Sequence, residues 1–330
     1  MRWRDRKGSD NVEDRRDETG GGGRGGFRFP FPRGGGGGFP GGRLPIPMGR
    51  GGGMGIFGII IVVGLMLLFG IDPRVILQGG SDGGTGIPLP RSEAPGRESP
   101  FPGLPTGGGQ SASRPGEDEL KQFVAVVLKT TEEVWQQQLP ALGKTYQEPK
   151  LVLFREGVSS QCGQGIAQMG PFYCPLDGKL YIDLSFFDEL KTRFRAPGDF
   201  AQAYVIAHEV GHHVQTLLGI TEQVMRAKAR GGERQGNAIQ VRMELQADCL
   251  AGIWAHHAQK SLQVVDPGDI EEALGAAAAI GDDHIQRRTQ GRVVPDAFTH
   301  GSSEQRVRWF KRGFQDGNFN SCNTFTGSEL

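Results

Sequence analysis

This sequence has no excess of positive or negative charge and no Cys-x-x-Cys pair, and each absence argues against one kind of binding site. Lysine and arginine together number 37 and aspartate and glutamate also number 37, so the formal net charge is zero. The whole-chain charge therefore gives no reason to expect a nucleic acid or an acidic surface as partner. None of the 4 cysteines lies in a Cys-x-x-Cys pair. A zinc cluster built from thiolates is therefore not expected.

Glycine and proline are abundant instead, with 54 and 20 residues, and most of them precede Pro115. Such a composition cannot bury enough apolar surface to offset the entropy of ordering. We therefore predict a disordered Arg/Gly-rich tail over residues 1–53 and a flexible Gly/Pro/Ser-rich linker over residues 72–116. A less favoured alternative for the tail is RNA binding, because interspersed Arg and Phe residues resemble segments that hold single strands by charge and stacking.

Residues 54–71 form the one long apolar run without charge. A stretch of about 18 residues is near the lower limit for a helix that crosses a bilayer. A signal peptide is the main competitor, but the run follows a long polar region and no Ala-x-Ala-like site follows it. Arginines gather before the run, so the positive-inside rule predicts a single-pass anchor with a cytoplasmic N-terminus. The remainder of the chain would then lie outside the cytoplasm.

Residues 117–330 show the periodicity of one folded domain of α+β class, mostly helical with a small sheet. Two short strands are expected at residues 150–154 and 179–184. Helices are expected at residues 117–139, 185–194, 203–219, 238–260, 269–280 and 303–314. Asp199 is expected to cap the helix that contains residues 203–219.

The helix from Ala203 to Gly219 carries the pattern His-Glu-x-x-His. Residues four apart lie on one helix face, so His208 and His212 can both reach one metal ion. Glu209 lies about 100° further round, where it can accept a proton from a metal-activated water but is poorly placed as a ligand. The pattern is short, and a helix that merely contains two histidines is the alternative.

A tetrahedral Zn²⁺ ion needs a third protein ligand. Glu244 and Asp248 are four residues apart and lie among apolar neighbours such as Val241 and Leu245, so their face is expected to turn inward. We predict Glu244 as the third ligand and Asp248 as the acceptor for the free N–H of a ligand histidine. A solvated acidic stripe on an ordinary helix is the alternative.

His300 is the candidate for stabilising the oxyanion that forms when a peptide carbonyl is attacked, with Arg306 behind it. A turn or capping role is an equally weighted alternative. Four other histidines lie outside the predicted group of metal ligands and are expected to pack in the structure or lie on the surface: His213, His256, His257 and His284.

The even cysteine count in a domain expected outside the cytoplasm suggests disulfides. Of the three pairings, Cys162–Cys174 with Cys249–Cys322 is preferred. Four reduced thiols are the alternative if the membrane topology is inverted.

Three segments together resemble the bacterial putative neutral zinc metallopeptidase family: residues 207–215, 244–249 and 299–306. Gly170-Pro-Phe-Tyr-Cys-Pro175 also fits, whereas the Gly-rich first part of the chain carries no motif of the family. The Glu-x-x-x-Asp pattern is similar to that of the membrane metallopeptidases that include the CAAX prenyl proteases.

This resemblance implies a zincin fold, in which an active-site helix, a second helix and the edge strand of a sheet bind zinc and substrate. By that analogy the edge would lie at residues 170–173 or 180–183, where a peptide could add a strand. The bacterial inner membrane would carry the anchor and the domain would be periplasmic or extracytoplasmic.

We therefore expect a membrane-anchored zinc endopeptidase that acts on peptides or unfolded proteins. The alternative is a catalytically silent, zinc-stabilised binding module, although an intact Glu209 argues against it. The ligands also accept Mn²⁺ or Co²⁺. The sequence predicts neither the substrate nor the oligomeric state.

Overall fold

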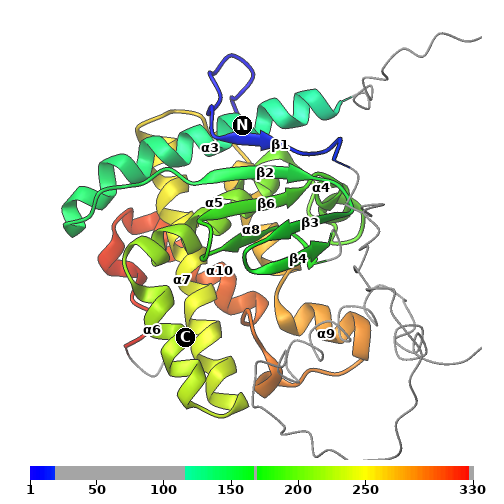
Figure 1. Cartoon of the computed structure of the whole chain (residues 1–330), viewed down its shortest axis with the longest axis vertical. Helices are drawn as coiled ribbons and strands as arrows, with labels where there is room; N and C mark the ends of the chain where they lie inside the picture. Colours follow the sequence, from blue (N-terminus) through cyan, green and yellow to red (C-terminus); the bar gives the residue numbers. More distant parts are fainter. Residues whose placement is uncertain (19–115, 167–168, 327–330) are drawn as a thin grey trace, which may run out of the picture. The chain divides into compact units, whose positions relative to one another are not determined.

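The computed structural model describes residues 1–18, 116–166 and 169–326 (Figure 1). These residues form a small sheet and a larger set of helices, which confirms the predicted α+β class with mostly helical content. The elements in chain order are β1 (Val12–Asp14), α3 (Glu117–Gln138), η1 (Leu139–Leu142), β2 (Lys150–Phe154), β3 (Gly157–Ser160), β4 (Gly163–Ile166), β5 (Phe172–Cys174), β6 (Lys179–Asp183), α4 (Ser185–Thr192), α5 (Asp199–Leu217), α6 (Ile220–Arg230), α7 (Glu233–Lys260), α8 (Asp269–Ala279), α9 (Asp282–Gln290), η3 (Pro295–Ala297), α10 (Ser303–Asp316) and η4 (Phe319–Cys322).

The main sheet has the strand order β1-β2-β6-β5. Strands β1 and β6 both run parallel to β2, and β5 runs antiparallel to β6. Among the described strands β5 is therefore an edge, and it overlaps the predicted edge segment 170–173. The other, residues 180–183, was wrong as an edge, because both sides of β6 are paired and the strand is buried.

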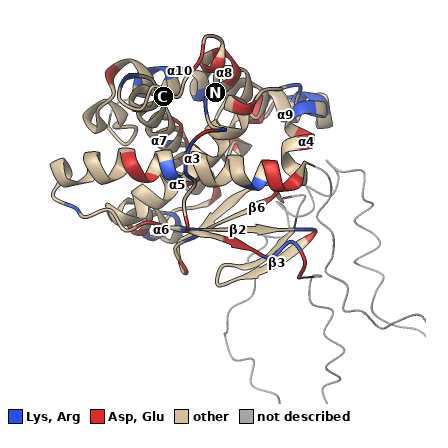
Figure 2. Ribbon diagram, turned by 90° about the horizontal axis from the view of Figure 1, so that it is seen from above, with Lys and Arg blue, Asp and Glu red and all other residues tan. Residues whose placement is uncertain are grey.

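The side chains of the two central strands alternate between the faces of the sheet, as the pleat requires. One set packs in the main core with the helices: Leu151, Leu153, Leu180 and Ile182. The opposite set forms a second small core with Val158 of β3: Val152, Phe154 and Tyr181. Figure 2 shows α3 and α5 on one side of β2 and β6. The sheet thus supports α5 from one face only.

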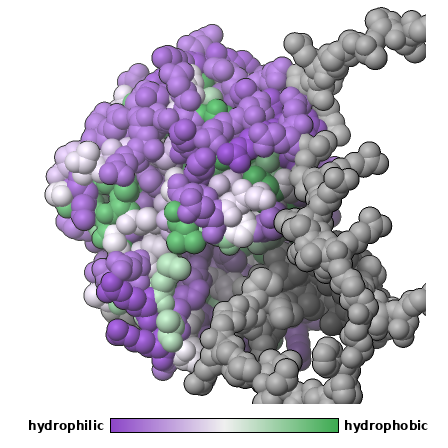
Figure 3. Space-filling model, viewed as in Figure 1, coloured by the Kyte–Doolittle hydropathy of each residue, from purple (hydrophilic) through white to green (hydrophobic). Residues whose placement is uncertain are grey.

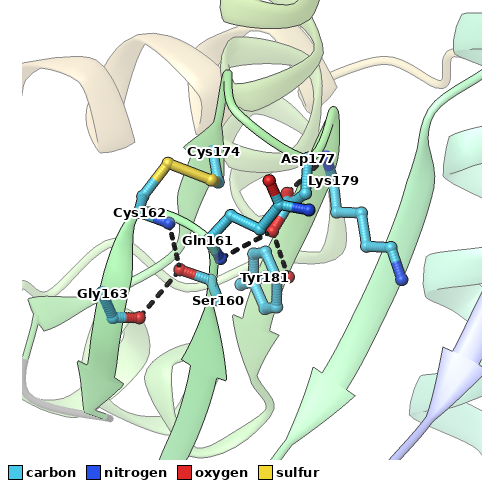
Figure 4. The surroundings of a disulfide bond; sticks show 8 residues. All are labelled: Ser160, Gln161, Cys162, Gly163, Cys174, Asp177, Lys179 and Tyr181. Atoms are coloured by element: carbon cyan, nitrogen blue, oxygen red, sulfur yellow. Dashed lines mark hydrogen bonds between the residues drawn. A yellow bond between two sulfur atoms is a disulfide. The ribbon is translucent and has the colours of Figure 1, made fainter.

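The hairpin β3–β4 is tied to the edge strand β5. The disulfide Cys162–Cys174 joins the hairpin turn to the end of β5 (Figure 4). Beside it, Asp177 accepts hydrogen bonds from the backbone N–H of Gln161 and from the hydroxyl of Tyr181. This first disulfide was predicted correctly, and it fixes the hairpin next to β5.

Residues 1–18 are folded, so the prediction of disorder over residues 1–53 was wrong for this part of the tail. Trp3 is 6 % exposed and packs edge-on against Phe123 of α3, with ring centroids 5.3 Å apart. The buried carboxylate of Glu132 accepts hydrogen bonds from Ser9 Oγ (2.6 Å) and Asn11 Nδ2 (3.0 Å). A short polar segment can therefore dock because it satisfies a buried charge. Residues 19–53 lie outside the described residues.

Ion pairs add to the docking of β1. Glu13 accepts from Lys179 at 3.0 Å, and Asp14 accepts from Arg16 at 2.7 Å and from Lys121 at 2.9 Å. The hydrogen bond from Arg16 and the ammonium of Lys121 hold the pKa of Asp14 well below its usual range, although desolvation opposes them. The strand is therefore joined to α3 and β6 by charge as well as to β2 by its backbone.

The apolar run 54–71 and residues 72–115 of the predicted linker also lie outside the described residues. Within the described part of the chain, no helix is both long and apolar enough to cross a membrane. On the face shown in Figure 3, hydrophilic residues predominate among the described residues and apolar ones form small separate areas. The apolar side chains of this unit are mainly used for its core.

Candidate metal centre

Helix α5 places His208 and His212 one turn apart on the face that meets α7. Close contact between the two helices depends on Gly211, because a Cβ at this position would lie 3.0 Å from the carbonyl oxygen of Ala247. His208 is 6 % exposed, and the side chain of His212 is 12 % exposed. The glycine inside the His-Glu-x-x-His pattern therefore lets α7 bring its own side chains against the histidines.

Glu244 of α7 meets both imidazoles. Its Oε2 lies 3.2 Å from Nε2 of His208 and 3.4 Å from Nε2 of His212. A tetrahedral ion with ligand bonds of about 2.0–2.1 Å needs donor atoms roughly 3.3 Å apart. The three donor atoms all lie within 4.8 Å of one another, so these residues fit a zinc ion. The structure brings the three predicted ligands together.

The other ring nitrogen of each histidine has its own partner. Nδ1 of His208 lies 2.9 Å from Oδ1 of Asp248, and Nδ1 of His212 lies 2.9 Å from Oε1 of Gln215. Because carboxylate and amide oxygens accept hydrogen bonds, both Nδ1 atoms are donors, and both Nε2 atoms are on the side of the ring that faces Glu244. Asp248 occupies the position that we predicted for it.

Gln215 was missed in the sequence analysis. Its Nε2 donates to the carbonyl oxygen of Met243 (2.7 Å) and to Oε1 of Gln246 (3.0 Å), so its Oε1 is left for the imidazole of His212. The available signal was the spacing, since Gln215 is three residues after His212 and on the same helix face.

Asp248 belongs to a buried network beneath the metal-binding face. Its Oδ1 accepts from the hydroxyl of Tyr204 at 2.5 Å, and both of its oxygens accept from Arg306 at 2.9 Å. Nη2 of Arg306 also donates to the Tyr204 hydroxyl at 3.1 Å. Arg306 thus pairs with Asp248, whereas the sequence analysis placed it behind His300. The role of Tyr204 was not predicted.

Burial and neighbouring charges shift the pKa values of Glu244 and His208 in opposite directions. Burial tends to raise the pKa of Glu244, but the charge of His212 and the hydrogen bonds from both imidazoles hold this pKa well below its usual range. Burial tends to lower the pKa of His208, but Asp248 and Glu244 raise this pKa to about 9. In the metal-free site the imidazole of His208 therefore holds a second proton near neutral pH, which an ion has to displace.

Glu209 differs from the other carboxylates of the site. It is 8 % exposed, and its carboxylate makes no hydrogen bond to a described residue. Burial is the largest influence on its pKa and raises it, while His212 and His208 oppose the shift. A carboxylate of raised pKa is a better proton acceptor near neutral pH. The arrangement suits Glu209 to the proton transfer that the sequence predicted.

His300 lies at the border of the site, in the segment before α10. Asp282 accepts the backbone N–H of His300 at 2.6 Å, and its Oδ1 lies 3.4 Å from the ring Nδ1. Desolvation lowers the pKa of His300, but Asp282 and Glu244 outweigh it and raise the pKa to about 8. The charge of His300 acts on both Glu209 and Glu244. Its contact with substrate stays a prediction.

The remaining histidines lie outside the cluster. His213 bridges α5 to the edge strand, with Nδ1 3.1 Å from the hydroxyl of Tyr173 and Nε2 2.6 Å from the carbonyl oxygen of Gln147. His256 and His257 each contact a carbonyl oxygen at the end of α10. His284 lies on α9. The expectation of roles other than ligation agrees with these positions.

The second disulfide, Cys249–Cys322, was also predicted correctly. It joins α7 to η4 one residue after Asp248. Gln246 on the same helix donates to the carbonyl oxygen of Cys322 at 3.0 Å. The segment of α7 that carries Glu244 and Asp248 is therefore fixed to the C-terminal part of the domain.

Comparison with known proteins agrees with this site. A family model described as "Putative neutral zinc metallopeptidase" matches residues 1–325, including the segment of β1. The uncharacterized protein YpfJ of Escherichia coli K12 is 47% identical over 325 residues, 98% of this chain and 99% of that protein. The uncharacterized protein Rv2575 of Mycobacterium tuberculosis H37Rv is 45% identical over 207 residues, 60% of this chain and 68% of that protein. No solved structure matches the chain. The chain belongs to the putative neutral zinc metallopeptidase family.

Proposed function

We propose that the protein is a zinc-dependent endopeptidase that hydrolyses peptides or unfolded proteins. The observation that carries the proposal is the position of Glu244 Oε2, 3.2 and 3.4 Å from the Nε2 atoms of His208 and His212. The family and this donor set support zinc as the ion. A bound zinc ion would supply a Lewis acid that polarises a peptide carbonyl and makes a water nucleophilic near neutral pH.

The protein groups perform the proton transfers. Glu209 accepts a proton from the attacking water, for which its raised pKa and free carboxylate are suited. The same carboxyl then gives this proton to the departing amide nitrogen. His300 donates a hydrogen bond to the oxyanion through Nε2, because its Nδ1 faces Asp282 and Thr299.

The edge strand β5 is the proposed binding site for the substrate backbone. One side of β5 pairs with β6, and no other described strand pairs with its outer side. Tyr173 of β5 contacts His213, the residue that follows His212. An extended peptide that added a strand to β5 would therefore run beside the metal-binding helix.

The compartment is a further part of the proposal. Two disulfides, Cys162–Cys174 and Cys249–Cys322, support an oxidising environment outside the bacterial cytoplasm. The apolar residues 54–71 support attachment to the inner membrane, with residues 1–18 on the same side as the rest of the folded unit because β1 pairs with β2.

Cleavage of unfolded casein by the full chain tests the activity. We expect cleavage with zinc, none after chelation, and recovery when zinc is added back. Zinc binding without cleavage, at any casein concentration, would instead favour a silent binding module.

A further inference from the structure

The second oxygen of Glu244 has a partner of its own. Nε2 of Gln240, one turn earlier on α7, donates to Oε1 of Glu244 at 2.7 Å. Oε2 of the same carboxylate faces the two imidazoles. The carboxylate is therefore held at both oxygens, one by an amide and one by the metal-binding face.

The orientation of that amide is fixed from another helix. Oε1 of Gln240 accepts from Nζ of Lys228 on α6 at 2.7 Å. If the amide of Gln240 turned over, its carbonyl oxygen would face the carboxylate of Glu244 and its NH₂ group would face the ammonium of Lys228. Both contacts would be repulsive, so Lys228 selects the orientation in which Gln240 donates to Glu244.

We propose that Gln240 and Lys228 are positioning residues for the metal centre. Gln240 occupies Oε1 of Glu244 and so leaves Oε2 alone for the ion. A carboxylate that binds through one oxygen, with two imidazoles, leaves the fourth tetrahedral position open to water or substrate. Lys228 acts through Gln240, and it links the short helix α6 to the geometry of the site.

This inference rests on the proposed metal binding but not on peptidase activity. The test is the zinc dissociation constant of the full chain, measured by competition with a chelator at fixed pH. We expect Gln240→Met to weaken zinc binding by about 10–100-fold, the usual effect of removing a partner of a ligand. Gln235→Met, on the exposed first part of α7, is the matched control and is expected to bind zinc as the unmodified chain does.

A double substitution separates positioning from a general structural effect. Lys228→Met is expected to weaken zinc binding less than Gln240→Met, because the bond from Gln240 to Glu244 can still form. The double variant is expected to bind no more weakly than Gln240→Met alone, because Lys228 acts through that amide. The metal-free variants are expected to unfold at the temperature of the unmodified metal-free chain.

If the unmodified chain takes up zinc, three results would overturn the inference: unchanged zinc binding by Gln240→Met, additive losses in the double variant, or an equal loss with Gln235→Met. If the unmodified chain binds zinc but does not cleave casein, a weakened Gln240→Met still supports the inference while the proposed function fails. A chain that takes up no zinc overturns both.

Discussion

Asp248 and Arg306 form a two-bonded ion pair inside the protein, with Nε to Oδ2 and Nη2 to Oδ1 both at 2.9 Å. Their side chains are 0 % and 3 % exposed. The same carboxylate holds His208, so the pair connects α10 to the metal-binding face of α5 through α7.

Removing one member of this pair should destabilise the fold strongly. Asp248→Ala leaves the guanidinium of Arg306 buried without its partner, and breaking such a pair costs about 3–5 kcal/mol. Urea unfolding monitored by circular dichroism measures the change. Glu222→Ala, which breaks the exposed pair with Arg226, is the control and should change stability little. Equal stability of the two variants would mean that the buried pair does not hold α10.

Replacing Glu209 by Gln should separate metal binding from catalysis. The amide cannot accept the proton of water, so casein cleavage should fall by at least about 100-fold. Zinc content, measured by atomic spectroscopy, should remain that of the unmodified chain, because the three ligands are intact. Glu233→Gln, exposed at the start of α7, should retain full activity. Normal cleavage by Glu209→Gln would remove this residue from the mechanism.

Zinc should stabilise the unmodified chain but not the variant Glu244→Ala. A ligand present at 100 times its dissociation constant adds about 2.7 kcal/mol to the free energy of unfolding. Addition of zinc to the metal-free chain should therefore raise its melting temperature in differential scanning fluorimetry. With Glu244→Ala this shift should be small or absent, because two imidazoles alone bind the ion weakly. A full shift in the variant would show that another group is the third ligand.

The N-terminal segment should contribute to the stability of the folded domain. Trp3 packs on Phe123, and its Nε1 donates to Asp199 at 3.1 Å. Trp3→Ala should lower the free energy of unfolding by about 3–5 kcal/mol, as for other large buried side chains. Lys7→Ala is the control, since the side chain of Lys7 is 83% exposed. If Trp3→Ala unfolds at the same urea concentration as the unmodified chain, residues 1–18 do not support the domain.

The parts of the site that could be predicted were those set by local geometry. The spacing of His208 and His212 places both on one helix face whatever the surrounding fold. Glu244 and Asp248 required one more inference, that a carboxylate among apolar residues points inward. The bridge from Gln240 to Lys228 joins two helices across a Gly-Gly connection, and no periodic pattern reports such a contact.

The docked N-terminal segment shows the opposite case. Its composition is polar, and disorder is the usual result when little apolar surface can be buried. The segment folds because the rest of the domain supplies an apolar surface for Trp3 and hydrogen-bond partners for its polar groups. Glu132 needs donors from Ser9 and Asn11, and Asp199, predicted as a helix cap, instead accepts from Trp3 while Gly198 holds the capping position. These contacts join residues more than a hundred positions apart, so the pattern of neighbouring residues in the sequence does not predict them.

The pairing of β1 with β2 has a consequence for how the chain is delivered to its site of action. Val12 and Leu151 are neighbours in one sheet, so they must fold on the same side of any lipid barrier. If the chain crossed a bilayer once at residues 54–71, Val12 and Leu151 would lie on opposite sides of the membrane and could not pair. The cytoplasmic placement expected for residues 1–53 does not fit this pairing if the domain over residues 117–330 is exported. If the folded unit is exported, residues 1–18 must be exported with it.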